Sequence, residues 1–120
     1  MPICKRVQDL LEGIAGGPTY VFGTQEADRP FNGWGRAQRD IIKATSLSHF
    51  TLHDLRRTFA TLHAKIGTPV HVTERLLNHV SGTISGVAAV YNRHSYAEEM
   101  RGATRRYDAL IEKLIDQRNG

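Results

Sequence analysis

The sequence predicts a mainly α-helical domain, a bundle of about six helices with at most one short strand. Apolar residues recur three and four positions apart along most of the chain, which is the spacing of one helix face. Helix-start signals precede these stretches, and glycine or proline follows most of them. With 120 residues the chain is one domain at most, and its 40% hydrophobic content suffices for a modest core.

The first third of the chain predicts two helices joined by a loop. Apolar residues three and four apart predict a helix over residues 5–14, and the glycine and proline residues at 16–18 end it. The short apolar run 20–22 predicts either a brief strand or a plug in the core. After a polar loop, Asn32 can cap a second helix that runs to about Ala44.

The strongest helix signal lies in the stretch that begins at Thr51. Thr51 and Asp54 have the spacing of a capping box, in which a hydroxyl and an acid satisfy free backbone N–H groups. Gly67 is suited to end this helix, because glycine readily adopts the left-handed conformation found there. One apolar stripe is predicted along the helix, at Leu52, Leu55, Phe59, Leu62 and Ile66.

Three further helices are predicted in the second half of the chain. A proline in the first position opens a helix over 69–77 after a Thr68 cap, and small apolar residues predict a short helix over 85–91. Ser95 and Glu98 repeat the capping box at the start of the last helix. The residues expected to face inward are Val72, Leu76 and Leu77 in the first of these helices, and Met100, Ala103, Tyr107, Leu110 and Leu114 in the last, which runs to about Gln117.

The net charge favours a polyanionic partner, although plain soluble domains often carry a similar excess. Lysine plus arginine exceeds aspartate plus glutamate by 16 − 12 = 4 residues, and the pI is about 9.6. A single cysteine, Cys4, excludes an intrachain disulfide and fits a reducing compartment. Neither a run of ~20 apolar residues nor a signal-peptide core is present, so we expect a cytoplasmic protein without a membrane partner.

Two polar residues near the start of the 51–66 helix are candidates for binding a phosphate. His53 and Arg56 are three apart, which places them side by side on the helix surface. Arginine offers phosphate a fixed fork of donors, and histidine offers one more. Taken alone, such a pair is also what an ordinary solvated helix face carries. His79 has a similar alternative as a helix-end histidine favoured by the helix dipole.

The order of motifs after residue 50 is more specific than any one of them. H-D-L-R-R-T-F at 53–59 is followed by L-L-N-H at 76–79 and by V-Y-N-R-H at 90–94. This order resembles the tyrosine recombinase family, in particular the phage-type integrases, and the resemblance is strongest over residues 50–100. The stretch between His79 and Tyr91 is longer than the common family form.

The resemblance implies a reaction on DNA that needs neither metal nor cofactor. It implies that Tyr91 attacks phosphorus and forms a 3′-phosphotyrosine, which a 5′-hydroxyl can reverse without ATP during DNA integration. It also implies that Arg56 and His79 stabilise charge on the phosphate, and that His53 acts as an acid–base partner or a further donor. Tyr96, at the start of the predicted last helix, is a rival for the nucleophile.

Five basic residues are candidates for contacts with the backbone of double-stranded DNA. Arg36, Arg39 and Lys43 are three and four apart, so they form a stripe along one face of the second predicted helix. Such contacts add affinity and salt dependence without sequence choice. A solvated face carries charges in the same pattern, so the stripe leaves both interpretations open. Arg57 and Arg93, close to the motifs, are expected to contact the DNA backbone rather than to catalyse.

The histidines do not predict a metal site. They show no H-E-x-x-H pattern, and a single cysteine cannot build a typical zinc site. Tight clusters of acidic residues of the kind that bind Mg²⁺ are also missing from the sequence. We therefore expect no bound metal. The six histidines are His49, His53, His63, His71, His79 and His94.

Parts of the family's catalytic domain have no counterpart in these 120 residues. The family has a further arginine early in that domain and a lysine on a β-hairpin, and neither has a matching segment, nor does the DNA-clamping domain. The resemblance therefore implies that residues 1–120 are the C-terminal portion of an integrase-type catalytic domain, truncated and by itself inactive. We also expect a homo-oligomer on DNA, formed through the C-terminal helix.

Two other interpretations of the sequence remain open. Residues 62–66, Gly67 and residues 69–77 form helix, tight turn and helix, which is also the pattern of a non-catalytic helix-turn-helix module. A third interpretation is an interaction domain that uses the C-terminal helix and has no affinity for DNA. The second helix of the helix-turn-helix offers few side chains to read bases, namely Thr73, Arg75 and His71.

Overall fold

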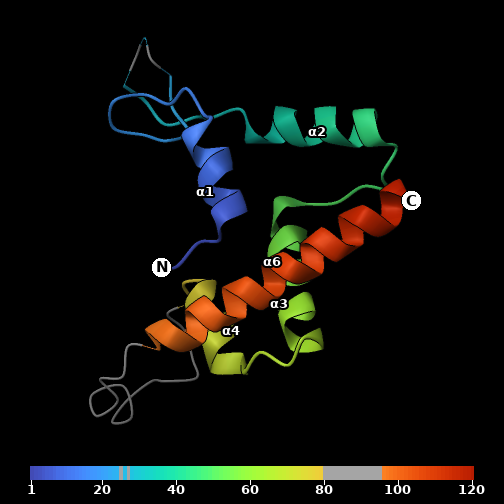
Figure 1. Ribbon diagram of the computed structural model, residues 1–120. Coiled ribbons are helices and arrows are strands. Elements are labelled where there is room, and N and C mark those ends of the chain that lie inside the picture. The colour runs from blue at the N-terminus through green and yellow to red at the C-terminus, as the bar shows by residue number, and fades with distance from the viewer. Residues whose placement is uncertain (25, 27, 80–95) are drawn as a thin grey trace. The chain divides into compact units, whose positions relative to one another are not determined.

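A computed structural model describes residues 1–120 except 25, 27 and 80–95 (Figure 1). Within that part of the chain there are five helices and no strand, so the prediction of a mainly α-helical fold is confirmed. The predicted helix over 85–91 lies outside the described residues, and the total of about six helices stays a prediction. The helices are α1 (Lys5–Glu12), α2 (Trp34–Thr45), α3 (Leu52–Lys65), α4 (Val70–Leu76) and α6 (Ala97–Asn119).

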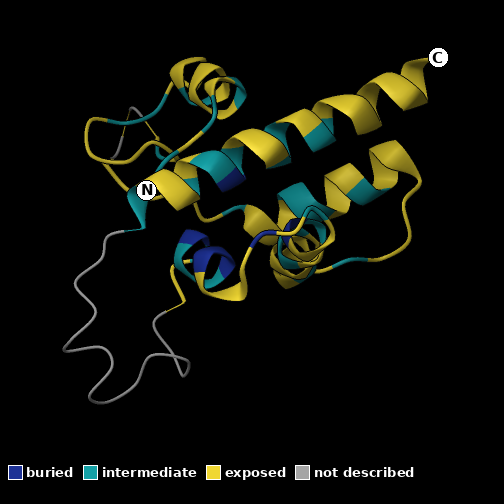
Figure 2. Cartoon of the chain, turned by 60° about the horizontal axis from the view of Figure 1, so that its bottom comes forward, coloured by how far each residue is buried: buried dark blue, intermediate teal, exposed yellow. Residues whose placement is uncertain are grey.

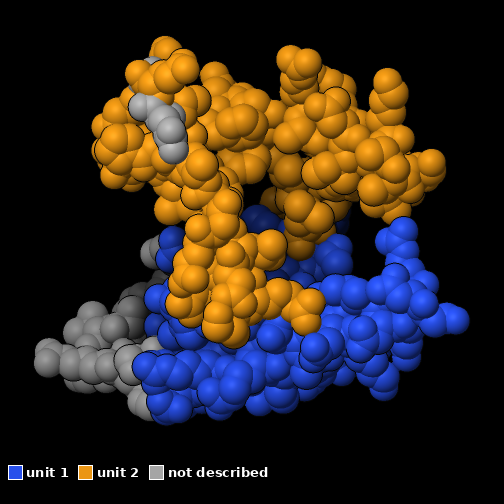
Figure 3. Space-filling view, turned by 45° about the horizontal axis from the view of Figure 1, so that its top comes forward, with its two compact units in different colours: residues 1–4, 56–120 blue, residues 5–55 orange. Residues whose placement is uncertain are grey.

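The chain divides into two compact units, which Figure 3 shows in different colours. The boundary between them falls inside α3. One unit contains residues 1–4 and 56–120, and the other contains residues 5–55. In the first unit α4 packs on α6. Each unit has its own internal packing.

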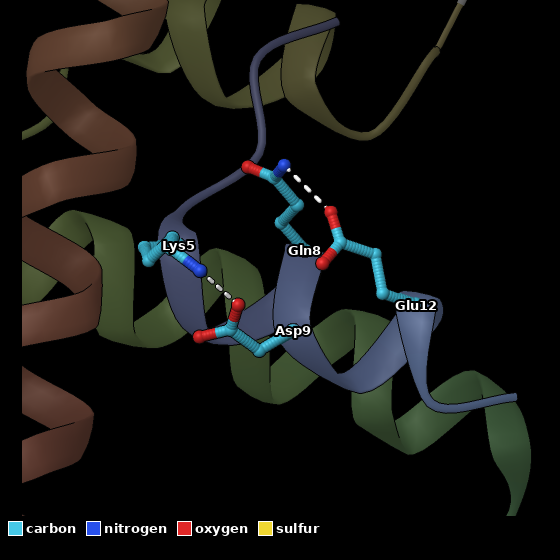
Figure 4. A network of polar contacts seen from close by, with 4 residues as sticks. All are labelled: Lys5, Gln8, Asp9 and Glu12. Carbon is cyan, nitrogen blue, oxygen red and sulfur yellow. Dashed lines mark hydrogen bonds and ion pairs between the residues drawn. The ribbon is translucent and has the colours of Figure 1, made fainter.

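Helix α1 is a surface helix whose polar side chains pair one turn apart (Figure 4). Lys5 Nζ donates to Asp9 Oδ1, and Gln8 Nε2 donates to Glu12 Oε1 at 2.8 Å. Pairs of this kind stabilise an isolated helix by only about 0.2–0.5 kcal/mol each. No residue of α1 is buried, and the helix ends two residues before the predicted end, where Gly13 donates its N–H to the Asp9 carbonyl.

The apolar run 20–22 is neither a strand nor a core plug, contrary to both predictions. Its side chains are 40–54% exposed. Among the described residues, β-type pairing is limited to one antiparallel bridge between Gly23 and Pro30. Beside it, the N–H of Phe31 donates to the Phe22 carbonyl at 2.6 Å. The bridge joins the two ends of the loop without placing the apolar run in a core.

Helix α2 begins at Trp34, later than a cap at Asn32 would place it. Gly33 occupies the N-cap position, and no side chain caps the helix. The Trp34 ring instead packs edge-on against Phe31 and Phe22, with ring centroids 4.9 and 5.6 Å apart. Aromatic contacts therefore fix the entry of this helix in place of the expected amide cap.

Helix α3 begins with the predicted capping box. Thr51 Oγ accepts a hydrogen bond from the N–H of Asp54 at 3.2 Å, and Asp54 Oδ2 accepts one from the N–H of Thr51 at 2.8 Å. The residue before the box is tied to α2, because Gln38 Nε2 donates to the Phe50 carbonyl. An aspartate thus completes the box despite its shorter side chain.

The core of the unit formed by residues 1–4 and 56–120 lies where α4 packs on α6 (Figure 2). Val72, Leu76 and Ala103 are buried, as the sequence predicted. Phe59 from α3 and Met100 from α6 pack against these three side chains. Three helices therefore contribute to one small apolar cluster.

The apolar stripes predicted for α3 and α6 are only partly buried. Leu52 and Leu55 are 42% and 56% exposed, and Leu114 is 43% exposed. The side chain of α3 that has no exposed surface is instead His63. The buried face of α3 is therefore rotated away from the predicted stripe and toward His63, which a hydrophobicity scale ranks as polar.

His63 lies in a small aromatic cluster that explains its burial. Its ring stacks on Tyr107, with centroids 4.8 Å apart and planes 6° apart, and lies 4.3 Å from Phe59. Burial, together with the nearby Arg106, lowers the pKa of His63, and burial raises the pKa of the Tyr107 hydroxyl. Both shifts favour the neutral form of the ring, which suits an apolar surrounding.

Helix α3 ends in a Schellman turn. Gly67 has a φ of +73°, and the N–H of Thr68 donates to the His63 carbonyl at 2.9 Å. The prediction that Thr68 caps the next helix is wrong, because Pro69 occupies that N-cap position. The Thr68 hydroxyl is instead in hydrogen-bond contact with His63 Nδ1, at 2.9 Å. The turn therefore joins α3 to α4 and satisfies one nitrogen of the buried histidine.

Candidate functional site

Helix α4 ends in a second Schellman turn, formed by the L-L-N-H motif. Asn78 has a φ of +52°, a conformation that asparagine tolerates better than most side chains. The N–H of His79 donates to the Glu74 carbonyl at 2.9 Å, and the N–H of Asn78 donates to the Arg75 carbonyl at 3.0 Å. These are the two backbone bonds of the motif. The chain therefore folds back so that residue 79 lies beside residue 74.

Arg56 reaches this turn from α3. Its Nη2 donates to the Leu77 carbonyl at 2.5 Å, and this carbonyl belongs to the last turn of α4, where the helix itself provides no partner. Cα atoms two residues apart are at most about 7 Å apart. Arg56 therefore contacts the same turn to which His79 belongs.

The imidazole of His79 contacts an acid that the sequence reasoning did not single out. His79 Nδ1 is 2.9 Å from Glu74 Oε2, and the two side chains are 45% and 30% exposed. Because a carboxylate only accepts, Nδ1 is the donor and Nε2 is left for another partner. Asn78 in L-L-N-H is the sequence signal that could have identified Glu74. An asparagine at the end of a helix favours a Schellman turn, and such a turn at Asn78 places His79 beside Glu74.

Of the charges at the turn, the positive charge of Arg56 is the one that can attract an anion such as phosphate. The C-terminal end of a helix disfavours negative charge, and the Glu74 carboxylate adds to that effect. Arg56 is exposed, and its guanidinium has five N–H donors, so the bond to Leu77 leaves others for a ligand. The net charge of the turn then depends on whether His79 is protonated.

The structure does not test the roles of three other predicted site residues. His53 is exposed in the first turn of α3 and belongs to the unit of residues 5–55. Tyr91 and Arg93 lie outside the described residues. Their assigned roles therefore stay predictions.

Four of the five basic residues predicted to contact DNA are among the described residues, and all four are exposed. Arg36, Arg39 and Lys43 lie on α2, in the unit of residues 5–55. Arg57 is exposed on α3, in the other unit. A phosphate contact requires such exposure, but a solvated helix face shares it, so DNA contact by these residues stays a prediction.

Tyr96, the rival nucleophile, packs against α4. Arg75 Cζ lies 4.4 Å from the centroid of the Tyr96 ring, and the His71 ring lies 5.0 Å from it. Thr73 is buried, and its hydroxyl donates to the Pro69 carbonyl at 3.4 Å. The side chains expected to read bases in a helix-turn-helix are therefore occupied by contacts within the protein.

The described residues offer neither a metal site nor a membrane span. No group of three potential metal ligands is found among them, and none of their helices is long and apolar enough to cross a membrane. An open hollow in the unit of residues 5–55 contains none of the predicted catalytic residues. It is lined by Thr24, Arg29, Pro30, Phe31, Asn32 and Gly33.

Comparisons with known proteins do not assign the chain to a family. No family model, no curated protein and no solved structure matches it. The function must therefore be argued from the motifs and from the turn at the end of α4.

Proposed function

We propose that the chain carries the strand-cleavage and rejoining chemistry of a phage-integrase-like tyrosine recombinase, acting on double-stranded DNA. The observation that supports this most is the hydrogen bond from Arg56 to the Leu77 carbonyl, which draws the arginine of H-x-x-R to the L-L-N-H turn. An arginine and a histidine at one turn can hold the phosphate whose charge grows during attack. The order of the motifs supplies the other assignments.

In the proposed reaction, the hydroxyl oxygen of Tyr91 attacks phosphorus and loses its proton to a base, the role assigned to His53. The bond from phosphorus to the 5′-oxygen breaks, and that oxygen leaves as a hydroxyl after taking a proton from the family's general-acid lysine. This sequence has no match for that lysine, so an added fragment must supply it. The product is a 3′-phosphotyrosine, which a second 5′-hydroxyl can attack in the reverse sense. A phenol has a pKa of about 10, so it needs cationic neighbours such as Arg56 to react near pH 7.

The 120-residue chain alone is expected to give no detectable turnover. The family's further arginine and its lysine have no matching segment in this sequence. Removing one preorganised donor from such a site typically costs on the order of 10²–10³ in rate. The two losses need not add, but together they should lower the rate below detection.

The first test offers the protein a nicked duplex oligonucleotide that traps a phosphotyrosyl adduct, read as a covalent band on a denaturing gel. It is run with the chain alone and with an added fragment that carries the arginine and lysine of a phage integrase. We expect a band only in the second reaction, lost in Tyr91→Phe and kept in the matched control Tyr96→Phe. A band unchanged in Tyr91→Phe, or no band in either reaction, would contradict the proposal.

The second test measures binding to double-stranded DNA as a function of salt. The log of the affinity should fall with the log of salt by about 0.9 per phosphate neutralised. Replacing the stripe of Arg36, Arg39 and Lys43 by alanine should therefore reduce the slope by about 2–3. Binding that does not change with salt would contradict DNA recognition through this stripe. The matched control replaces three exposed basic residues outside the stripe, Lys65, Lys113 and Arg118.

A further inference from the structure

Glu74 is joined to His79 twice, once by the backbone and once by the side chain. The Glu74 carbonyl accepts from the His79 N–H, and the Glu74 carboxylate accepts from Nδ1, both at 2.9 Å. In Schellman turns these two positions are commonly joined by a hydrophobic contact. Here a polar pair takes its place, so the turn fixes an acid against one particular ring nitrogen.

We propose that Glu74 is a positioning residue that fixes the tautomer and the orientation of the His79 ring at the turn reached by Arg56. The carboxylate holds the hydrogen on Nδ1, and Nε2 becomes the ring nitrogen that is offered to a substrate. Without this acceptor the neutral ring can take either tautomer and can rotate. The use of Nε2 toward a DNA phosphate rests on the proposed function, whereas the fixing of the ring does not.

The pair is too exposed to serve mainly in folding. With side chains 45% and 30% exposed, it belongs to the class of surface pairs that add little to stability. Glu74 lies inside α4, where alanine is a better helix former than glutamate. The Glu74→Ala variant should therefore fold normally, and any effect on His79 can be assigned to the lost carboxylate.

The deciding measurement is the tautomer of His79 in the full chain, read from the ¹⁵N shifts of its imidazole near pH 8. His79→Gln identifies the signals. We expect the Nδ1–H form in the wild type, its retention in Glu74→Gln, whose amide oxygen still accepts, and a shift toward the Nε2–H form in Glu74→Ala. The matched control is Glu98→Ala, which removes a glutamate that pairs with Arg101 on α6 and should leave His79 unchanged. An Nε2–H form in the wild type, or no change in Glu74→Ala, would overturn the proposal.

A second measurement uses the adduct assay with the added integrase fragment. Hydrogen-bond partners that orient metal-binding histidines are typically worth about 10–100-fold. By analogy, Glu74→Ala should slow adduct formation by roughly this factor, and Glu74→Gln should slow it much less. In the His79→Ala background, Glu74→Ala should have no further effect, because it acts through that ring. A further drop would overturn the positioning role. If the wild type forms no adduct while the tautomer result holds, the recombinase function fails and the positioning of His79 stands.

Discussion

Helices α3 and α4 end in the same backbone turn, yet the histidine at one end is buried and the histidine at the other is exposed. At the end of α3, Gly67 is left-handed and His63 contacts a threonine hydroxyl with none of its surface exposed. At the end of α4, Asn78 is left-handed and His79 contacts a glutamate with 45% of its side chain exposed. Both contacts are 2.9 Å long and both use Nδ1.

The difference between the two ends comes from their neighbours rather than from the turn. Phe59 and Tyr107 cover the ring of His63, so a neutral histidine with a neutral partner fills space there. At the other end, Arg56 is the neighbour that arrives from α3, and both its side chain and that of His79 remain open to solvent. The neighbours therefore make His63 a structural histidine and leave His79 able to meet a ligand.

The largest expected difference between the ends is in stability. His63→Ala should lower the free energy of unfolding by about 3–5 kcal/mol, as other buried ring-to-alanine changes do. His79→Ala should change it by less than about 0.5 kcal/mol, because an exposed side chain leaves no cavity. Urea denaturation of both variants measures this. Similar losses in the two variants would show that the two turns are energetically alike.

Replacing the hydrogen-bond partner of each histidine should also cost more stability at the buried end than at the exposed end. Thr68→Val keeps the size of the side chain but leaves Nδ1 of buried His63 without its partner, which should cost about 1–3 kcal/mol. Glu74→Gln at the exposed end should stay within about 0.5 kcal/mol. The same denaturation experiment applies, and a Thr68→Val protein as stable as the wild type would contradict a structural role for this contact.

The left-handed residues should differ by a smaller amount. A Cβ at Gly67 would meet no atom within 4 Å, so Gly67→Ala loses only the backbone preference, about 1–2 kcal/mol. Asn78→Gly should be neutral or stabilising by a few tenths of a kcal/mol, since glycine takes a positive φ more readily. Thermal unfolding of both variants is the measurement. Destabilisation by Asn78→Gly would mean that the asparagine side chain does more than tolerate the turn.

The smallest effect is a pH dependence at the buried end. Burial and Arg106 lower the pKa of His63 below 6.5, so on acidification the unfolded chain takes up a proton before the folded one. The contribution of His63 to the free energy of unfolding should therefore be fully present above about pH 6.5 and should fall as the pH drops below that value. The slope should correspond to the uptake of less than one proton on unfolding. Denaturation from pH 5 to 8 measures the slope, which should decrease in His63→Phe. A slope unchanged in His63→Phe would assign it to another group.

Local signals in the sequence predicted both ends of α3. The capping box at Thr51 and Asp54 and the left-handed glycine after α3 are both present, because each depends only on neighbouring residues. The predictions at Asn32 and Thr68 failed for one reason. Each side chain was expected to cap a helix, but an aromatic contact or a buried histidine determines the structure there.

Burial was less predictable than the helix ends. Periodicity placed Leu55 in the core and gave His63 no structural role, whereas Leu55 is 56% exposed and His63 is fully buried. The contacts that make a buried histidine favourable include the ring of Tyr107, which lies far along the chain and which periodicity does not reveal. For the site, the motifs identified Arg56 and His79, but Glu74 required the geometry of the turn. The roles of His53 and Tyr91 still rest on the motifs.

The attachments of α4 also determine how this part of the chain opens. Helix α4 has seven residues, which is too short to persist alone in water. It is held by Arg56 at its last turn, by Tyr96 against one face, and by Val72 and Leu76 in the core. Its amide hydrogens should therefore exchange with solvent in the same cooperative event as those of the first half of α6, and their exchange rate should not exceed the rate measured there.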